Sequence, residues 1–314
     1  MRIANSSLGA AALALVLGTT GSVPAAHGQP HEPMSAATAP ARAHDHAGDG
    51  CLSATQRKRH CAGVPRAGAG SGTVTIDILA AFTSKAAAEA GGEGRVRSRI
   101  RQAVSSASQA FATSAVHARL RLVGITRVRV PARLDLTGDG LLTAVARRGD
   151  GVADGLPRLR EQYGADLVTV VTGSQGASGL ASRPRRVTSR TSGYSYSLVA
   201  QNGLARHSLA HEIAHNLGAQ HDHVTAPRGG ATARGHFPRS GAWSTIEAYE
   251  SSCRRATGGR CTRINRFSNP RQTYGGERLG TPVWEARPAD TVRVFNAVVR
   301  IVAGYRERPH RARH

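Results

Sequence analysis

Apolar and polar positions follow a regular pattern from residue 73 onward, and the period of this pattern predicts the structure of each stretch. In residues 73–82, Val74, Ile76 and Ile78 alternate with polar residues. This period of two predicts a β-strand with one face toward the core. In residues 95–116, apolar residues recur every three or four positions, which predicts an amphipathic helix.

The next stretches repeat this alternation of strand and helix. Residues 118–125 predict a second strand, and residues 155–163 predict a short helix. Residues 166–172 are almost all apolar or β-branched, which is typical of a buried strand in a parallel sheet. The order strand, helix, strand, helix, strand favours a mostly parallel α/β sheet.

The second half of the chain is less regular. Residues 174–193 are rich in Gly, Ser and Arg, and they precede a helix that we expect to begin near Asn202. After Asp222 the chain is irregular and rich in glycine. Asp290 is placed to cap a last helix, which extends to about Tyr305 with apolar residues along one face.

The first 70 residues have a different character. Residues 1–28 combine Arg2 with a short apolar run and then small residues, which predicts a secretory signal peptide. Residues 29–70 contain few large apolar residues, so we expect a propeptide or disordered segment. The folded domain is then expected at residues 71–306, followed by a basic tail at residues 307–314.

The net charge of +22 comes almost entirely from arginine, because Lys58 and Lys85 are the only lysines. The arginines are scattered along the chain, and aromatic residues make up only 4% of it. Since proteins that bind single-stranded nucleic acids place aromatic rings among their basic residues, we expect no specific nucleic-acid partner. No later stretch is long and apolar enough to predict a membrane partner.

The strongest chemical signal lies in residues 211–222, which read His-Glu-Ile-Ala-His-Asn-Leu-Gly-Ala-Gln-His-Asp. On a helix, His211 and His215 would share one face, at a spacing that suits two imidazoles on one Zn²⁺. Gly218 can take a positive φ, end the helix and reverse the chain. That turn would bring His221 back as a third ligand.

Glu212 follows the first histidine and is placed to polarise a water rather than to bind the metal. With it, this stretch resembles the active-site sequence of metzincin zinc endopeptidases, and Asp222 resembles their reprolysin branch. The resemblance implies one Zn²⁺ per chain on the three histidines, with Glu212 as general base. It also implies a metzincin-type α/β fold: a mostly parallel twisted sheet with an antiparallel edge strand, an active-site helix, and a smaller irregular C-terminal subdomain ending in a helix.

Residues further along resemble the secreted bacterial peptidyl-Asp metalloendopeptidases. The similar features are Cys253, Cys261, residues 263–270 and the final helix. This resemblance implies a secreted, extracellular endopeptidase, with part of residues 179–182 as the strand that borders the substrate cleft. It also implies cleavage on the amino side of aspartate. We therefore expect a protein or peptide substrate and a monomeric enzyme.

One position departs from the metzincin pattern. Metzincins carry a methionine turn beneath the zinc imidazoles, and Glu247 stands where the methionine is expected. A buried carboxylate needs partners, so Glu247 either accepts hydrogen bonds from the ligand imidazoles or distorts the site. The alternative function is thus a catalytically weakened zinc-binding pseudoprotease that binds peptides or surfaces. Tyr249 either supports the transition state or is a structural tyrosine.

The chain has four cysteines, an even number that suggests disulfides in an exported protein. Local pairing needs the least loop closure. The expected disulfides are Cys51–Cys61 and Cys253–Cys261. In the alternative, a thiolate of Cys51 or Cys61 binds the open zinc position and keeps a zymogen latent.

Overall fold

The computed structural model describes residues 72–307. The expected signal peptide and propeptide segment, together with Cys51 and Cys61, lie outside the described residues, as does all but the first residue of the expected tail. Among the described residues, no helix combines the length and the apolar character needed to cross a membrane.

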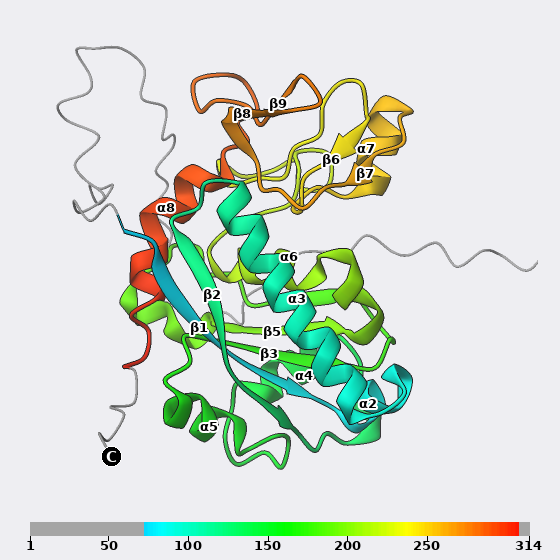
Figure 1. The fold of residues 1–314 in the computed structure, drawn as a ribbon, viewed down its shortest axis with the longest axis vertical. Coiled ribbons are helices and arrows are strands. Elements are labelled where there is room, and N and C mark those ends of the chain that lie inside the picture. The colour runs from blue at the N-terminus through cyan, green and yellow to red at the C-terminus, as the bar shows by residue number, and fades with distance from the viewer. Residues whose placement is uncertain (1–71, 308–314) are drawn as a thin grey trace, which may run out of the picture. The chain divides into compact units, whose positions relative to one another are not determined.

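The described residues are built on a five-stranded sheet with the strand order β2-β1-β3-β5-β4. Four strands are parallel, and β4 pairs antiparallel with β5 at one edge. This arrangement confirms the predicted mostly parallel sheet with an antiparallel edge strand. Figure 1 shows the parallel strands β2, β1, β3 and β5. The strands are β1 (Val74–Phe82), β2 (Ala118–Arg127), β3 (Leu167–Thr172), β4 (Gly179–Ala181) and β5 (Tyr196–Ala200).

Helices cover both faces of this sheet. Ile76, Ile78 and Phe82 of β1 belong to a core with the helices of one face, whereas Leu79 and Ala81 belong to a second core on the opposite face. The first face is covered by α2 (Ser84–Ala90), α3 (Glu93–Thr113), α6 (Ser208–Asn216) and α8 (Thr291–Val302), and the second by α4 (Asp139–Val145) and α5 (Leu156–Tyr163).

The expectation that the first strand has only one buried face was wrong. Thr75 and Asp77, the polar positions of β1, are only 8% and 1% exposed. Asp77 is tolerated inside because Arg121 of β2 donates two hydrogen bonds to its carboxylate, at 2.6 and 2.7 Å. Because a charged residue can be buried when it is paired, polar residues at alternate positions do not prove that one face of a strand is exposed.

Between α6 and the final helix α8 the chain contains only short elements, as the predicted fold class requires. A disulfide between Cys253 and Cys261 closes the loop between two of them. The final helix returns to the sheet, and the Asp290 carboxylate accepts a hydrogen bond from the backbone N–H of Arg293 at its start. The short elements are β6 (Trp243–Ser244), α7 (Glu250–Thr257), β7 (Thr262–Arg263), β8 (Asn269–Tyr274) and β9 (Glu277–Leu279), and the 3₁₀ helices of the chain are η1 (Ala132–Leu134), η2 (Ser189–Tyr194) and η3 (Gln201–Arg206).

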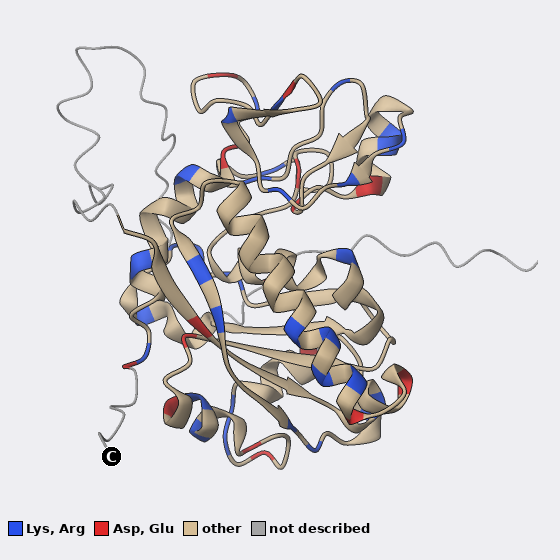
Figure 2. Ribbon diagram, viewed as in Figure 1, with Lys and Arg blue, Asp and Glu red and all other residues tan. Residues whose placement is uncertain are grey.

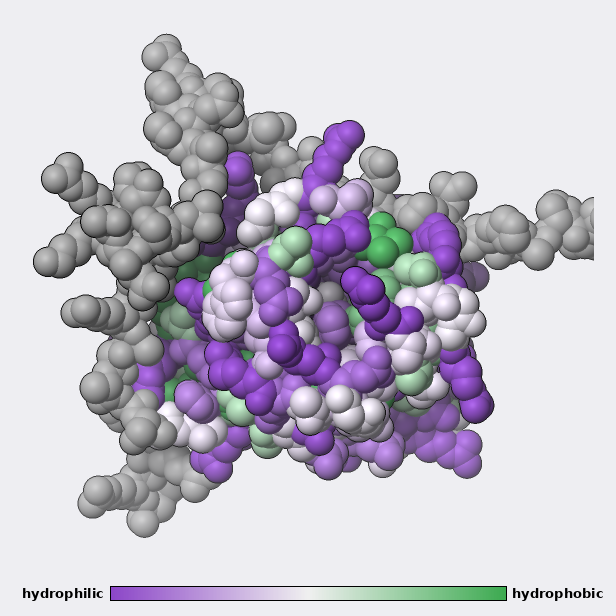
Figure 3. Space-filling model, turned by 90° about the horizontal axis from the view of Figure 1, so that it is seen from above, coloured by the Kyte–Doolittle hydropathy of each residue, from purple (hydrophilic) through white to green (hydrophobic). Residues whose placement is uncertain are grey.

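Basic residues are spread over helices, strands and loops rather than gathered on one element (Figure 2). On the face seen in Figure 3, hydrophilic side chains predominate and apolar ones form only small separate patches. The basic residues seen in this view of the described part of the chain are therefore spread over many elements.

Candidate metal centre

Helix α6 carries the first two histidines, but it begins later than the sequence suggested. The segment Gln201–Arg206 forms the 3₁₀ helix η3, and α6 starts only at Ser208. Between them His207 takes a φ of 62°, in the left-handed region that interrupts a helical path. Helical periodicity does not reveal such a break, because a 3₁₀ turn and an α-helix bury similar positions.

The predicted turn after the second histidine is present. Gly218 has a φ of 93°, a conformation that a residue with a Cβ rarely adopts. Its N–H donates to the carbonyl of His215 at 2.9 Å, and the next N–H, of Ala219, donates to Ala214 at 2.9 Å. These bonds satisfy carbonyls at the end of α6 and direct the chain back toward His221.

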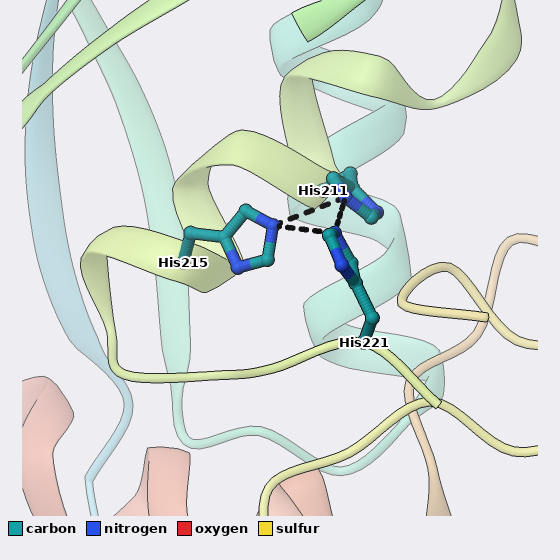
Figure 4. Close-up of side chains that lie close together, drawn as sticks. All are labelled: His211, His215 and His221. Carbon is teal, nitrogen blue, oxygen red and sulfur yellow. Dashed lines mark hydrogen bonds between the residues drawn. The ribbon is translucent and has the colours of Figure 1, made fainter. Parts of the chain in front are cut away.

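The three histidine side chains converge from α6 and this returning segment. Each pair of their Nε2 atoms is 3.1 Å apart (Figure 4). Among the described residues, His211, His215 and His221 are the one group of three ligating side chains whose atoms lie close enough to share a metal ion. The structure thus brings together the three predicted ligands, which are buried or nearly so.

Backbone carbonyls fix the orientation of two of these rings. The Nδ1–H of His211 donates to Ile246 at 2.9 Å, and the Nδ1–H of His215 donates to Ala219 at 2.9 Å. Burial lowers the pKa of His211 well below 6.5 and the pKa of His215 to about 4, so both rings are neutral near pH 7. With Nδ1 protonated, each Nε2 carries a lone pair that points at the other two rings.

This arrangement suits a cation better than hydrogen bonds. Two acceptor nitrogens at 3.1 Å cannot bond to each other, whereas a shared metal ion would use both lone pairs. Zn–N distances of about 2.05 Å place tetrahedral ligand atoms about 3.3 Å apart. The observed 3.1 Å is close to that spacing. The donor set of three imidazoles with one open position is typical of a catalytic zinc site.

Glu212 is buried beside the triad, with 4% of its surface exposed. Burial raises its pKa well above 4.5, and the positive charge of Arg263 acts in the opposite direction. The edge strand β4 packs directly on this carboxylate. A Cβ added to Gly179 would lie 2.7 Å from Glu212 Cγ, so only glycine leaves room for the side chain. The resemblance to metalloendopeptidases implied this edge strand but not its contact with Glu212.

Glu247, which stands at the expected methionine position, lies beside the rings of His211 and His215. Its side chain is 1% exposed, and its carboxylate oxygens are 3.4 Å from Nδ1 of His211 and 3.6 Å from Nδ1 of His215. These contacts are not ion pairs, because burial keeps both imidazoles neutral. Both oxygens are buried without a hydrogen-bond partner, since the Nδ1 protons go to backbone carbonyls instead. With these tautomers the ligand imidazoles donate to backbone carbonyls rather than to Glu247, and the effect of Glu247 on the site stays a prediction.

Tyr249 completes the wall of the site. Its ring centroid lies 4.5 Å from that of His221 and 6.0 Å from that of His211. Burial is the main cause that raises the pKa of Tyr249, followed by the charges of Glu212 and Glu247, so its hydroxyl stays protonated at neutral pH. The backbone N–H of Tyr249 donates to the carboxylate of Asp222 at 3.0 Å.

The sequence analysis missed how the loop with the third histidine is held. Arg234 is fully buried, and its guanidinium donates only to backbone carbonyls, among them that of His221 at 3.2 Å. A buried arginine without a carboxylate contact can hold a loop in place by donating hydrogen bonds to several backbone carbonyls at once. No local spacing in the sequence signals this role, because its partners surround it only in the folded chain. The other acceptors are Ala226, Arg228, Gly229 and Ala231.

Comparisons with known proteins agree with this geometry. The sequence profile described as metallo-peptidase family M12 matches residues 72–268. The peptidyl-Asp metalloendopeptidase of Stenotrophomonas maltophilia strain R551-3 is 31% identical over 244 residues, which cover 76% of this chain and 54% of that protein. The protein of the same name from Xanthomonas campestris is 31% identical over 245 residues, with 77% and 55% covered.

The chain spans about half the length of these two relatives. Among solved structures, a chain from a chaperone-substrate complex superposes with a TM-score of 0.57 at 21% identity, over 75% of this chain and 39% of that chain. At this identity the superposition supports the fold alone.

Proposed function

Since this chain belongs to metallo-peptidase family M12, we propose that it is a secreted, extracellular zinc endopeptidase with Glu212 as general base. The single observation that carries the proposal is the convergence of three Nε2 atoms, each pair 3.1 Å apart, beside the buried Glu212. His211, His215 and His221 would hold Zn²⁺. The disulfide at Cys253 and Cys261 is consistent with an oxidising, extracellular location.

Zinc, when bound, supplies Lewis-acid polarisation of the scissile carbonyl and makes water acidic enough to attack it at neutral pH. Glu212 takes a proton from the attacking water, and its raised pKa suits this exchange. It then delivers that proton to the nitrogen of the leaving amine. Burial of Glu212 keeps bulk water away from the carboxylate during both transfers.

Two neighbouring groups assist Glu212 in this proposal. The protonated hydroxyl of Tyr249 is available as a hydrogen-bond donor to the oxyanion that forms during attack. The strand β4 lies at the edge of the sheet, so an extended substrate is able to pair with its free side through main-chain hydrogen bonds. The substrate is thus a protein or peptide bound in an extended conformation.

We further propose cleavage on the amino side of aspartate. The similar proteins are named peptidyl-Asp metalloendopeptidases. The positive charge of this chain is also compatible with an acidic side chain in the substrate.

The test compares wild-type protein with Glu212→Gln in zinc content and in cleavage of casein and of a peptide library. We expect one zinc per chain in both proteins, chelator-sensitive cleavage by the wild type, and a loss of cleavage in the variant by at least about 100-fold. Cleavage by Glu212→Gln at the wild-type rate would exclude Glu212 as the base.

A zinc-binding pseudoprotease is the second candidate, and Glu247 favours it. Its buried carboxylate has no hydrogen-bond partner next to the ligand imidazoles. In this second candidate it disturbs the geometry of the imidazoles and thereby weakens catalysis. This candidate predicts stoichiometric zinc and peptide binding without cleavage by the wild type. Replacing Glu247 by Met would then create activity, whereas the endopeptidase already has it.

A further inference from the structure

Arg263 lies next to the metal centre although it is far from the histidines in sequence. Strand β7 pairs with β6 so that Arg263 lies opposite Ser244, at the start of the turn that carries Glu247. Its backbone N–H donates to the Glu250 carboxylate at 3.1 Å, and its Nη2 donates to the carbonyl of Ala248 at 3.2 Å. The side chain is therefore anchored along the wall formed by residues 248–250.

The charge of Arg263 acts on several groups of the centre, among them His211 and Glu247. It lowers the pKa of Glu212, for which it is the only charged group that acts besides burial. It also lowers the pKa of Tyr249, which lines the same wall. Arg183, the other cation near the site, acts on His215 and, more weakly than Arg263, on Glu247. The geometry agrees, because Ala248, which accepts the hydrogen bond from Nη2 of Arg263, lies between Glu247 and Tyr249. Glu247 is 3.4 Å from Nδ1 of His211, and the Tyr249 ring is 4.5 Å from that of His221, so Arg263 is held at the wall of the metal centre.

The guanidinium of Arg263 still has unused hydrogen-bonding capacity. Arginine carries five N–H donors, and Nε of Arg263 is buried without a partner. Within residues 72–307, no carboxylate forms an ion pair with Arg263. A buried donor without a partner costs free energy. A bound ligand with a carboxylate would supply both the missing hydrogen-bond acceptor and the missing negative charge.

The chemistry of hydrolysis identifies that ligand. Glu212 must reach the leaving nitrogen, so the first residue after the scissile bond passes beside Glu212. We propose that Arg263 is the residue that selects an acidic side chain at this substrate position. This inference rests on the proposed endopeptidase function and names the residue that determines which substrate side chain is accepted. A guanidinium binds a carboxylate with two parallel hydrogen bonds, which favours aspartate over its neutral isostere asparagine.

The experiment uses the full-length protein as purified, with synthetic peptides that differ only at the residue after the scissile bond, either Asp or Asn. The ratio of kcat/KM for the two peptides is measured for wild type, Arg263→Gln, Arg263→Lys and the control Arg183→Gln. We expect the wild type to prefer Asp, and Arg263→Gln to lose roughly 10- to 100-fold of that preference, the range of one charge-assisted interaction. The control should keep the preference, since Arg183 acts on His215 and Glu247 but not on Glu212.

Zinc content and melting temperature of each variant establish that it is folded. Where Arg263→Gln fails to fold, Arg263→Lys decides, because lysine keeps the charge but lacks the planar fork. Its Asp preference should fall at least about threefold, and an undiminished preference overturns the proposal. An equal loss of activity toward both peptides in Arg263→Gln also overturns it, because Arg263 would then serve Glu212 rather than the substrate.

A binding measurement separates this inference from the proposed function. Glu212→Gln is used to bind the intact Asp and Asn peptides, with and without Arg263→Gln. Tighter binding of the Asp peptide that depends on Arg263, by a wild-type protein that cleaves nothing, would support Arg263 while refuting the endopeptidase. Cleavage by the wild type without any preference for Asp would refute Arg263 and leave the endopeptidase intact.

Discussion

Replacing Glu247 by Met removes a buried carboxylate that has no hydrogen-bond partner. The two side chains have similar volume, so methionine fills the same space without a cavity. The penalty for a buried unsatisfied polar group is about 1–3 kcal/mol, and the metal-free variant should be more stable by that amount. For a domain of about 150–250 residues this corresponds to a rise in Tm of roughly 2–12 °C.

The sign of the pH dependence follows from the raised pKa of Glu247. A carboxyl whose pKa is higher in the folded state binds more protons there, so its contribution to stability is lost as pH rises above about 4.5. The advantage of Glu247→Met should therefore be larger at pH 8 than at pH 4.5. Thermal unfolding of chelator-treated protein at the two pH values measures it.

Zinc should reverse part of this gain. The Glu247 carboxyl lies 3.4 and 3.6 Å from Nδ1 of the two ligand imidazoles. A cation bound on the far side of these rings would oppose the burial that raises the pKa of Glu247, and the charged carboxylate would in turn stabilise the cation. Glu247→Met should therefore bind zinc about 10- to 100-fold more weakly in a chelator competition assay. The exposed Glu285→Met is the control, and we expect changes within about 0.5 kcal/mol for it. A metal-free Glu247→Met protein that melts below the wild type would refute the reasoning, because Glu247 would then have a stabilising partner.

Three further predictions concern residues around the centre. Gly179→Ala should push the Glu212 side chain away, because the new Cβ would lie 2.7 Å from its Cγ; kcat/KM should fall at least about tenfold while zinc content stays unchanged. Arg234→Gln should cost at least about 3 kcal/mol in urea unfolding and weaken zinc binding, because the carbonyl of His221 and others lose their donor; normal zinc affinity would contradict this. Burial lowers the pKa of His236 to about 4, so its stabilising contribution is lost as pH falls from about 6.5 toward 4. The free energy of unfolding should therefore fall between pH 7 and pH 4.5, and His236→Gln should make that fall smaller by about 2–3 kcal/mol.

The histidine triad could be predicted from sequence because its information is local. His211 and His215 are one helical turn apart, and Gly218 marks the reversal that returns His221. Strands β1, β2 and β3 were predictable for a similar reason, since apolar runs report burial directly. The start of α6 was not, because the positive φ of His207 leaves no trace in hydrophobic periodicity.

The groups around the triad could not be predicted, because folding brings them together from distant parts of the chain. Gly179 contacts Glu212 only because β4 lies at the sheet edge beside α6. In the sequence, Arg234 and Arg263 cannot be told apart from the many other arginines of this chain. Only the structure shows that they donate hydrogen bonds to backbone carbonyls near the metal centre. Sequence therefore predicted the metal site, and the structure adds the candidate groups that position the base and select the substrate.

The presence of one zinc ion on the three imidazoles is the central claim, and diffraction at the zinc absorption edge from crystals of the purified protein tests it most directly. The account predicts one anomalous peak per chain, about 2.0–2.1 Å from Nε2 of His211, His215 and His221. A peak bound by other side chains, or no peak in protein purified without chelator, would contradict it.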